Sequence, residues 1–397
     1  MKAAVPEHIP PELVVDFDRF QGPEVQRCPH RAVAELFNRG PDIFFTPQDC
    51  GHWVITRAED ARDMLRQPDK FSSDPRYNVA NTRKPRTLPN QSDPPEHTDL
   101  RRIVNGYFSP AGVQRMENEI RQLAKDLIDN VRARGHCEFI TEIAQRFPVE
   151  LFLRMADAPM TDRETLVEMA DRFTRAPEVT ERLAALDDLA NYLRGLIAER
   201  EKKPGSDLIS VVVHGKIAGR GLTDDEKIGM VSLLFLGGLD TVASMLSFIM
   251  AFLGQNPGHY QKLLADRSLI AGAVEELMRV HGVAGTERGV TADMEYKGVQ
   301  FKTGDRLVFL AHIYGLDDGA VDDPFKVDFD RPLSTHLVFG SGPHRCLGSH
   351  LARLEIKIFL EEWTLRISDF RVDVKGEIAT RGGLVWSPVL VPLVWPA

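Results

Sequence analysis

The sequence predicts a mainly helical protein with a small β region, and three observations carry this prediction. Apolar residues recur at helical spacing through most of 97–203, as in IRQLAKDLIDNVRARG. A long apolar stretch follows at 228–261. Strand-like patterns are short and confined to 42–58, 294–311 and 380–395. We therefore expect an α-rich core beside a β-rich subregion.

The N-terminal half is expected to begin with strands and to continue as helices. Residues 42–58 have the pattern of two short strands joined by a turn at Asp49–Gly51, and 59–67 have that of a helix. Residues 70–96 are rich in Pro, Asn, Arg and Ser, which predicts a long irregular segment. Loops of such length in compact domains usually have a function.

The C-terminal half contains the longest predicted helix. Thr223-Asp-Asp-Glu226 has the capping-box pattern of a helix start, directly before the apolar stretch. A further helix is expected over 268–281, followed by short strands within 294–311. A loop over 314–345 then leads into a last helix at 347–366.

Composition and organisation are typical of one globular domain. The chain has 397 residues, of which 43% are hydrophobic and 27% charged, so it can bury a large core. No repeat, low-complexity tract or Gly/Ser linker divides it, and we expect residues 1–397 to form a single domain. The net charge of −9 argues against a nucleic-acid partner.

Cysteine usage and hydropathy favour a cytoplasmic protein. The four cysteines include no Cys-x-x-Cys pair, which fits a reducing compartment better than a disulfide framework. The N-terminus lacks the apolar segment of a secretory signal. The stretch 228–261 is long enough to span a membrane, but Asp240 near its middle would cost about 2.5–3.5 kcal/mol there. We expect a buried helix and no membrane partner.

The strongest motif is a glycine-rich loop with a cysteine, FGSGPHRCLG, from Phe339 to Gly348. Cys346 precedes a predicted helix, whose N-terminal N–H groups favour a thiolate. Such a thiolate suits the axial position of haem iron, to which it donates electron density. Two alternatives stay open: a buried structural cysteine, and a small metal site formed by His344, Cys346 and His350.

Two further motifs lie on predicted helices. Glu276 and Arg279 are spaced i, i+3 and can form an ion pair, although most such pairs are solvated surface contacts. Within the apolar stretch, the hydroxyl of Thr241 could bond the carbonyl of Gly237 and open the helix locally. An acid beside that hydroxyl, Asp240, is a plausible proton relay; a close helix crossing with a satisfied core aspartate is the equal alternative.

Four cations are candidates for binding two carboxylates, such as the propionates of haem. His97 and Arg101 lie four residues apart at a predicted helix start, and Arg288 and His344 are the others. Charge-assisted hydrogen bonds would hold the carboxylates. Singly, each of the four has the pattern of an ordinary surface residue.

Taken together, these motifs resemble the cytochrome P-450 superfamily, and within it the bacterial soluble camphor 5-monooxygenase-like subfamily. The resemblance covers essentially the whole chain. It is carried by SDPPEH, LLFLGGLDTVASMLSF, EELMR, YKGVQFKTGD, CLGSHLARLE and VPLVWPA. It implies the cytochrome P-450 fold, a helical triangular prism that encloses haem b, with a β-rich corner.

The resemblance also implies roles for single residues. Cys346 would be the thiolate ligand of the iron, and Glu276 and Arg279 a structural pair on the same side. Asp240 and Thr241 would deliver protons during dioxygen activation, with Arg175 as the surface partner of Asp240. The implied haem-binding residues are His97, Arg101, Gly237, Gly238, Arg288, Phe339, His344, Cys346 and Gly348. The implied pocket walls are Leu233, Leu236, Val283, Ala284 and Val385.

Two departures from the subfamily pattern make camphor a doubtful substrate. Pro85 stands where the camphor enzyme has a tyrosine that donates to the substrate ketone, and loss of such a donor forfeits about 0.5–1.5 kcal/mol. Thr286 stands where that enzyme has an aspartate near the propionates. His281 falls near the expected pocket wall and could supply another polar contact; a core histidine bonded to the backbone is the more usual case.

We therefore expect a haem-thiolate monooxygenase that hydroxylates a C–H bond of a small hydrophobic terpenoid or norisoprenoid, such as an ionone. The resemblance implies O2 as co-substrate, and a [2Fe–2S] ferredoxin with an NADH-dependent ferredoxin reductase as electron donors. Basic residues that could face an acidic ferredoxin are Arg101, Arg102, Arg345 and Arg353. A peroxide-driven haem-thiolate peroxygenase and a non-enzymatic haem sensor are the alternatives.

Overall fold

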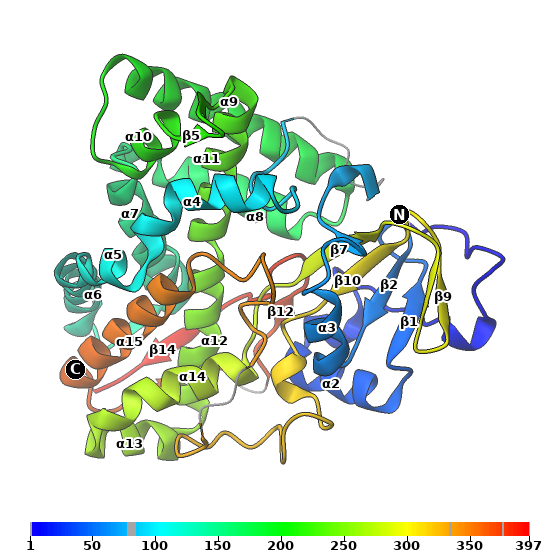
Figure 1. The fold of residues 1–397 in the computed structure, drawn as a ribbon. Coiled ribbons are helices and arrows are strands. Elements are labelled where there is room, and N and C mark those ends of the chain that lie inside the picture. Colours follow the sequence, from blue (N-terminus) through cyan, green and yellow to red (C-terminus); the bar gives the residue numbers. More distant parts are fainter. Residues whose placement is uncertain (1, 78–84, 333–335, 375–376, 397) are drawn as a thin grey trace.

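The computed structural model describes all residues except 1, 78–84, 333–335, 375–376 and 397. Helices gather on one side of the molecule, and the largest sheet lies on the other, beside α2 and α3 (Figure 1). The mainly helical architecture with small β regions is the one expected. The helices are α1 (Pro23–Gln26), α2 (Pro29–Arg39), α3 (Ala58–Met64), α4 (Glu96–Phe108), α5 (Pro110–Gln114), α6 (Glu117–Arg132), α7 (Arg146–Met155), α8 (Arg163–Arg175), α9 (Val179–Lys202), α10 (Leu208–Val213), α11 (Asp224–Leu239), α12 (Thr241–Gln255), α13 (Pro257–Ala265), α14 (Ile270–Val280) and α15 (Ser349–Arg366).

The largest sheet has five strands in the order β1-β2-β10-β7-β3. β2 pairs antiparallel with β1 and parallel with β10, so strands far apart in sequence meet. Its members are β1 (Ile43–Thr46), β2 (His52–Ile55), β3 (Phe71–Ser72), β7 (Thr286–Val290) and β10 (Arg306–Phe309). The smaller sheets contain β4 (His136–Glu138), β5 (Lys216–Ile217), β6 (Arg220–Gly221), β8 (Met294–Tyr296), β9 (Val299–Phe301), β11 (Arg371–Val372), β12 (Thr380–Arg381), β13 (Ser387–Pro388) and β14 (Pro392–Val394).

The apolar stretch forms two helices rather than one. The predicted capping box is present: the Thr223 side chain accepts from the N–H of Glu226, whose side chain accepts from the N–H of Thr223. α11 then ends at Leu239 and α12 begins at Thr241, so the break falls on Asp240. This stretch is long and apolar enough to cross a membrane, but 72% of its most apolar 18-residue window is buried inside the protein.

Several short strands were not expected from the sequence. β4 lies inside the region predicted to be helical and pairs with β14 near the C-terminus. A π-helical turn, Ile140–Ala144, follows it directly. β5 and β6 form a two-stranded hairpin between α10 and α11. These strands have two or three residues, which is too short for a periodic pattern to reveal.

The core around α15 is aromatic. Trp363 is fully buried and contacts the rings of Phe139, Phe370 and Trp395 at centroid distances of 5.9, 5.5 and 5.6 Å. Phe139 follows β4 and Trp395 follows β14, so this cluster joins the small C-terminal sheet to α15. Since α15 begins directly after the Cys346 loop, the packing fixes where that loop can lie.

Candidate active site

A cavity of about 560 Å³ lies between the α11–α12 break and the Cys346 loop. Its walls also include β7 and parts of the irregular segment 85–91. Every predicted pocket residue lines it: Leu233, Leu236, Val283, Ala284 and Val385. A separate hollow has a volume of about 690 Å³. Among the described residues that line it, Arg175 is the only one that the sequence analysis singled out.

The Cys346 loop is held by backbone geometry that requires glycine. Gly340 and Gly342 both have φ near +70°, and a Cβ on Gly342 would lie 2.2 Å from the carbonyl oxygen of Leu65. The N–H of Cys346 donates to the carbonyl of Phe339 at 2.8 Å, which closes the loop. The Cys346 side chain is exposed, and it lines the cavity. Its thiol is therefore open to the cavity.

The surroundings of the Cys346 thiol act on its pKa in both directions. Although its surface opens into the cavity, the Cys346 thiol lies deep inside the protein, and this desolvation raises its pKa, whereas the Gly348 N–H and Arg101 act to lower it. A coordinating metal ion deprotonates a thiol outright. A bound iron would therefore favour ionisation of Cys346 in the same direction as the Gly348 N–H and Arg101.

The predicted propionate-binding residues lie together at one edge of the cavity. The rings of His97 and His344 stand 4.1 Å apart, and Arg101 and Arg288 line the same wall. Burial, helped by the neighbouring arginines, lowers the pKa of His97 to about 4 and that of His344 to about 2. Burial also lowers the pKa of Arg288 to about 10. Both histidines are therefore neutral and both arginines charged at neutral pH.

These residues fit a haem. In the described part of the chain, Nδ1 of His97 and Nε2 of His344 are buried without a hydrogen-bond partner, as expected if a ligand supplies one. A Cβ on Gly237 would meet no atom within 4 Å, so α11 leaves open space for a flat group. Among the described residues, no group of three or more His, Cys, Asp and Glu could hold a metal ion, which disfavours the small metal site with His350.

Asp240 and Thr241 occupy the break between α11 and α12. The Thr241 hydroxyl donates to the carbonyl of Gly237 at 2.9 Å, as predicted, and Thr241 lines the cavity. Asp240 Oδ1 accepts from Arg175 at 2.8 Å, whereas Oδ2 is buried with no partner among the described residues. Arg175 also donates to Asp171 at 2.8 Å.

Glu276 and Arg279 form a buried pair, not a solvated one. Two bonds of 2.7 and 2.8 Å join them, and the residues are 5% and 2% exposed. Arg279 also donates to the carbonyls of Gly315, Pro324 and Lys326 at 2.5, 2.8 and 3.1 Å. The pair therefore ties the loop that precedes the Cys346 segment to α14.

Of the two alternatives for His281, a contact on the cavity wall is the one that the structure excludes. His281 does not line the cavity; it stacks on Phe248, and neither ring nitrogen has a hydrogen-bond partner in the described chain. His312, which was not predicted, lines the cavity instead. Pro85 does lie on the cavity wall. Thr286 accepts a hydrogen bond from Arg288 at 2.8 Å, so it orients that guanidinium.

A buried carboxyl group on the cavity wall makes stability depend on pH. Glu355 on α15 is 3% exposed, and burial raises its pKa to about 8. The carboxyl is protonated in the fold, so its contribution to stability is complete below the unfolded pKa near 4.5 and is lost as pH rises toward 8. Between these pH values the free energy of unfolding of the wild type should fall relative to that of Glu355→Gln, by up to about 1.4 kcal/mol per pH unit.

Urea unfolding of both haem-loaded proteins at pH 5, 6, 7 and 8 tests this, because the difference between them cancels the contribution of the buried histidines. A difference that stays constant over these values would contradict the assignment.

Comparison with known proteins agrees with the geometry. The family model described as Cytochrome P-450 matches residues 169–381. The chain is 34% identical to "Probable cytochrome P-450 127A1" of Sinorhizobium fredii, over 98% of this chain and 97% of that protein. It is 31% identical to the "Vitamin D3 dihydroxylase" of Streptomyces griseolus, over 86% of this chain and 87% of that protein.

Solved structures match over the whole length. The structure titled "Crystal Structure of CYP101J2" has a TM-score of 0.89 and 32% identity, and covers 100% of both chains. That of "Cytochrome P-450 CYP101C1" has a TM-score of 0.90 and 31% identity, and covers 99% of this chain and 100% of the other. The chain belongs to the cytochrome P-450 family of monooxygenases, whose cofactor is haem b.

Proposed function

We propose that this monooxygenase hydroxylates a C–H bond of a small hydrophobic terpenoid or norisoprenoid, with O2 and electrons from a [2Fe–2S] ferredoxin. The observation that carries the proposal is that the Cys346 thiol and the Thr241 hydroxyl border one cavity with largely apolar walls, with the buried Asp240 directly before Thr241. The haem, when bound, supplies the redox-active iron at which dioxygen is activated. We place the protein in the cytoplasm, where its free cysteines would stay reduced.

Cys346 would ligate the iron, and His97, Arg101, Arg288 and His344 would hold the two propionates. The two arginines bring charge, and each histidine has an unpartnered ring nitrogen that can bond a propionate oxygen. The guanidinium carbon of Arg353 lies 4.5 Å from the centroid of the Phe339 ring. This cation–π contact helps to hold the Cys346 loop against α15. Gly237 keeps α11 free of a side chain on the cavity side, whereas a Cβ on Gly238 would meet the ring of Phe152 at 2.5 Å, so Gly238 allows close packing of α7 against α11.

Asp240 and Thr241 would move protons into the cavity. The Thr241 hydroxyl keeps a lone pair for a proton donor because its own hydrogen goes to Gly237. Asp240 is held by Arg175, so it must exchange that bond before its carboxylate can reach Thr241. Arg175 lines the outer hollow, which gives this exchange a path to solvent.

Replacement of Thr241 by alanine should separate NADH consumption from product formation. General acid–base steps contribute about 100-fold or more, so product per NADH should fall by at least about tenfold, with peroxide released instead. Thr241→Ser keeps the hydroxyl and should retain most of the coupling. Coupled turnover by Thr241→Ala would instead favour a peroxide-driven enzyme.

The proposed docking patch for ferredoxin is smaller than the sequence suggested. Arg101 is half-buried, lines the cavity and donates to the carbonyl of Pro343 at 3.3 Å. Arg353 is tied to Glu275 by bonds of 2.5 and 3.0 Å. Arg102 and Arg345 are exposed and remain the candidates.

Arg102→Glu should slow electron transfer from an acidic ferredoxin several-fold at low ionic strength. The difference from wild type should shrink at high salt, because screening acts beyond about 10 Å at 0.1 M and about 3 Å at 1 M. Stopped-flow reduction of the haem measures the rate. Arg371→Glu is the matched control, since Arg371 is also exposed but lies on β11. Equal rates for both variants at every salt concentration would exclude the patch.

Visible-spectrum titration with β-ionone and camphor tests the substrate class. A spin-state shift with β-ionone and none with camphor is expected, because Pro85 offers no hydrogen-bond donor to the camphor ketone. A strong shift with camphor alone would contradict the proposal. It would also mean that another wall residue, such as His312, holds the ketone.

A further inference from the structure

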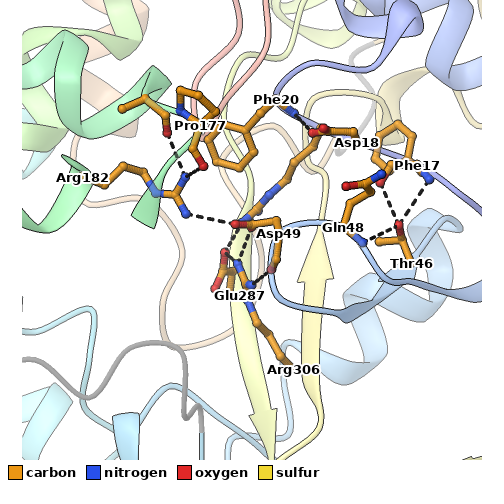
Figure 2. Close-up of polar contacts among 12 residues, drawn as sticks. Phe17, Asp18, Phe20, Thr46, Gln48, Asp49, Pro177, Arg182, Glu287 and Arg306 are labelled. Atoms are coloured by element: carbon orange, nitrogen blue, oxygen red, sulfur yellow. Dashed lines mark hydrogen bonds and ion pairs between the residues drawn. The ribbon is translucent and has the colours of Figure 1, made fainter. Parts of the chain in front are cut away.

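A buried cluster of charged residues lines the cavity on the side of β7 and β10. We call Arg19, Asp49, Arg182, Glu287 and Arg306 the arginine cluster. Figure 2 shows Asp49 at its centre, with Arg182 on one side and Glu287 and Arg306 on the other. Four of the five members, all but Asp49, line the same cavity as Cys346. None was predicted as a site residue.

The two carboxylates are densely bonded. Asp49 accepts from Arg19 at 2.7 Å, from Arg306 at 2.9 Å and from Arg182 at 3.0 Å. Glu287 accepts from Arg19 at 2.5 Å and from Arg306 at 2.6 and 2.9 Å. Burial opposes ionisation, but the arginines outweigh it and hold the pKa of both carboxyl groups below the usual range. Both are therefore ionised at neutral pH.

The five residues of the arginine cluster together carry one more positive than negative charge. Three guanidinium groups face two carboxylates, and Arg19 and Arg182 are only 3% and 7% exposed. Nε of Arg19 is buried with no hydrogen-bond partner among the described residues. A buried cation without a matching anion is costly, so such sites are usually paired or bind an anion.

The surroundings compensate only part of this excess. Phe20 lies between Arg19 and Arg182, with its ring centroid 5.3 and 4.4 Å from their guanidinium carbons. Arg182 also donates to the carbonyls of Ala176 and Pro177 at 2.8 and 3.0 Å. Burial still lowers the pKa of Arg182 despite the opposing effect of Asp49.

A purely structural role explains the ion pairs of the arginine cluster but not its excess positive charge. The cluster joins the N-terminal segment, α9 and the sheet, and two arginines would suffice to neutralise Asp49 and Glu287. The third guanidinium and the unpartnered Nε of Arg19 lie on the wall of a cavity whose other lining is largely apolar. An apolar molecule with one anionic end would match both features.

We propose that the cavity binds a hydrophobic substrate that carries a carboxylate, with this group bonded to Arg19 and Arg182 and the hydrocarbon extending toward Thr241. The inference rests on the proposed function and narrows its substrate class to terpenoid-sized acids. Carboxylate recognition by guanidinium groups is strong and directional. A neutral ketone would bind the same apolar walls without this anchor.

The test compares perillic acid with its methyl ester, which share one hydrocarbon skeleton and differ in charge. Spin-state titration of the haem-loaded wild type and of Arg19→Met gives the four dissociation constants. We expect the acid to bind the wild type about tenfold more tightly than the ester, and Arg19→Met to reduce this ratio to about one. A structural role would weaken both ligands equally and leave the ratio unchanged, which would overturn the proposal.

Two further variants keep the test decisive if Arg19→Met does not fold. Arg19→Lys retains the charge and should keep most of the preference for the acid, whereas Arg182→Gln removes a charge and should lower it. Wild-type binding of the ester but not of the acid would overturn the carboxylate assignment and leave the proposed function intact. Absence of a shift with the ester, the acid and β-ionone would contradict the proposed function itself.

Discussion

Replacing Cys346 by alanine should abolish monooxygenase activity and the ferrous–carbon monoxide absorption band that marks thiolate ligation. Among the described residues that line the cavity, Cys346 is the cysteine, and its thiol is exposed to the cavity. Without a thiolate the iron loses the electron donation that favours cleavage of the O–O bond. Product formation should therefore fall to background, while the apolar cavity walls and the edge formed by His97, Arg101, Arg288 and His344 are left in place.

The matched control is Cys50→Ala. Cys50 is exposed and free like Cys346, but it is not part of the cavity wall. The control should keep both the absorption band and the activity. If Cys346→Ala kept the thiolate-type band, ligation by this residue would be wrong, and another cysteine would have to take its place.

Replacing Arg279 by alanine should cost about 3–5 kcal/mol of folding free energy, because it leaves the buried Glu276 carboxylate without its main partner. The change also removes the donors to three loop carbonyls, of Gly315, Pro324 and Lys326. Since whole domains are stable by only about 5–15 kcal/mol, we expect little soluble, haem-loaded protein. Urea unfolding and the haem-to-protein ratio measure the effect.

Arg102→Ala is the control for this prediction. Arg102 and Asp99 also form a pair at i, i+3, at 2.8 Å, but the Arg102 side chain is 71% exposed. Exposed pairs contribute about 0–1 kcal/mol, so this variant should unfold close to the wild type. Similar unfolding midpoints for Arg279→Ala and Arg102→Ala would refute a structural role for the Glu276–Arg279 pair.

Much of the fold was predictable because its signals are local. Each of three correctly predicted features depends on residues that lie close together in the sequence. They are the capping box at Thr223, the strands within 42–58 and the helix that ends at Arg366. The Cys346 loop is also local, since its glycines lie within a few residues of the thiol. The Thr241 hydroxyl bond to Gly237 was predictable for the same reason.

The remaining features depend on contacts between distant segments. β4 exists because it pairs with β14, more than 250 residues later. The arginine cluster joins residues 19, 49, 182, 287 and 306, and no spacing rule connects them. The pKa of Cys346 also depends on how deep the thiol lies in the fold, which the sequence does not report. Whether His281 faces the core or the cavity was left open, because the sequence does not fix which way one side chain at a helix end points.

Turnover with isotopically labelled dioxygen tests the central assignment most directly. The protein, a [2Fe–2S] ferredoxin, its NADH-dependent reductase and β-ionone are incubated together, and the product is analysed by mass spectrometry. One labelled oxygen atom in a hydroxylated product, with one NADH consumed per product, is the expected result. Unlabelled product formed from hydrogen peroxide alone, with no dependence on ferredoxin, would contradict monooxygenase function and identify a peroxygenase.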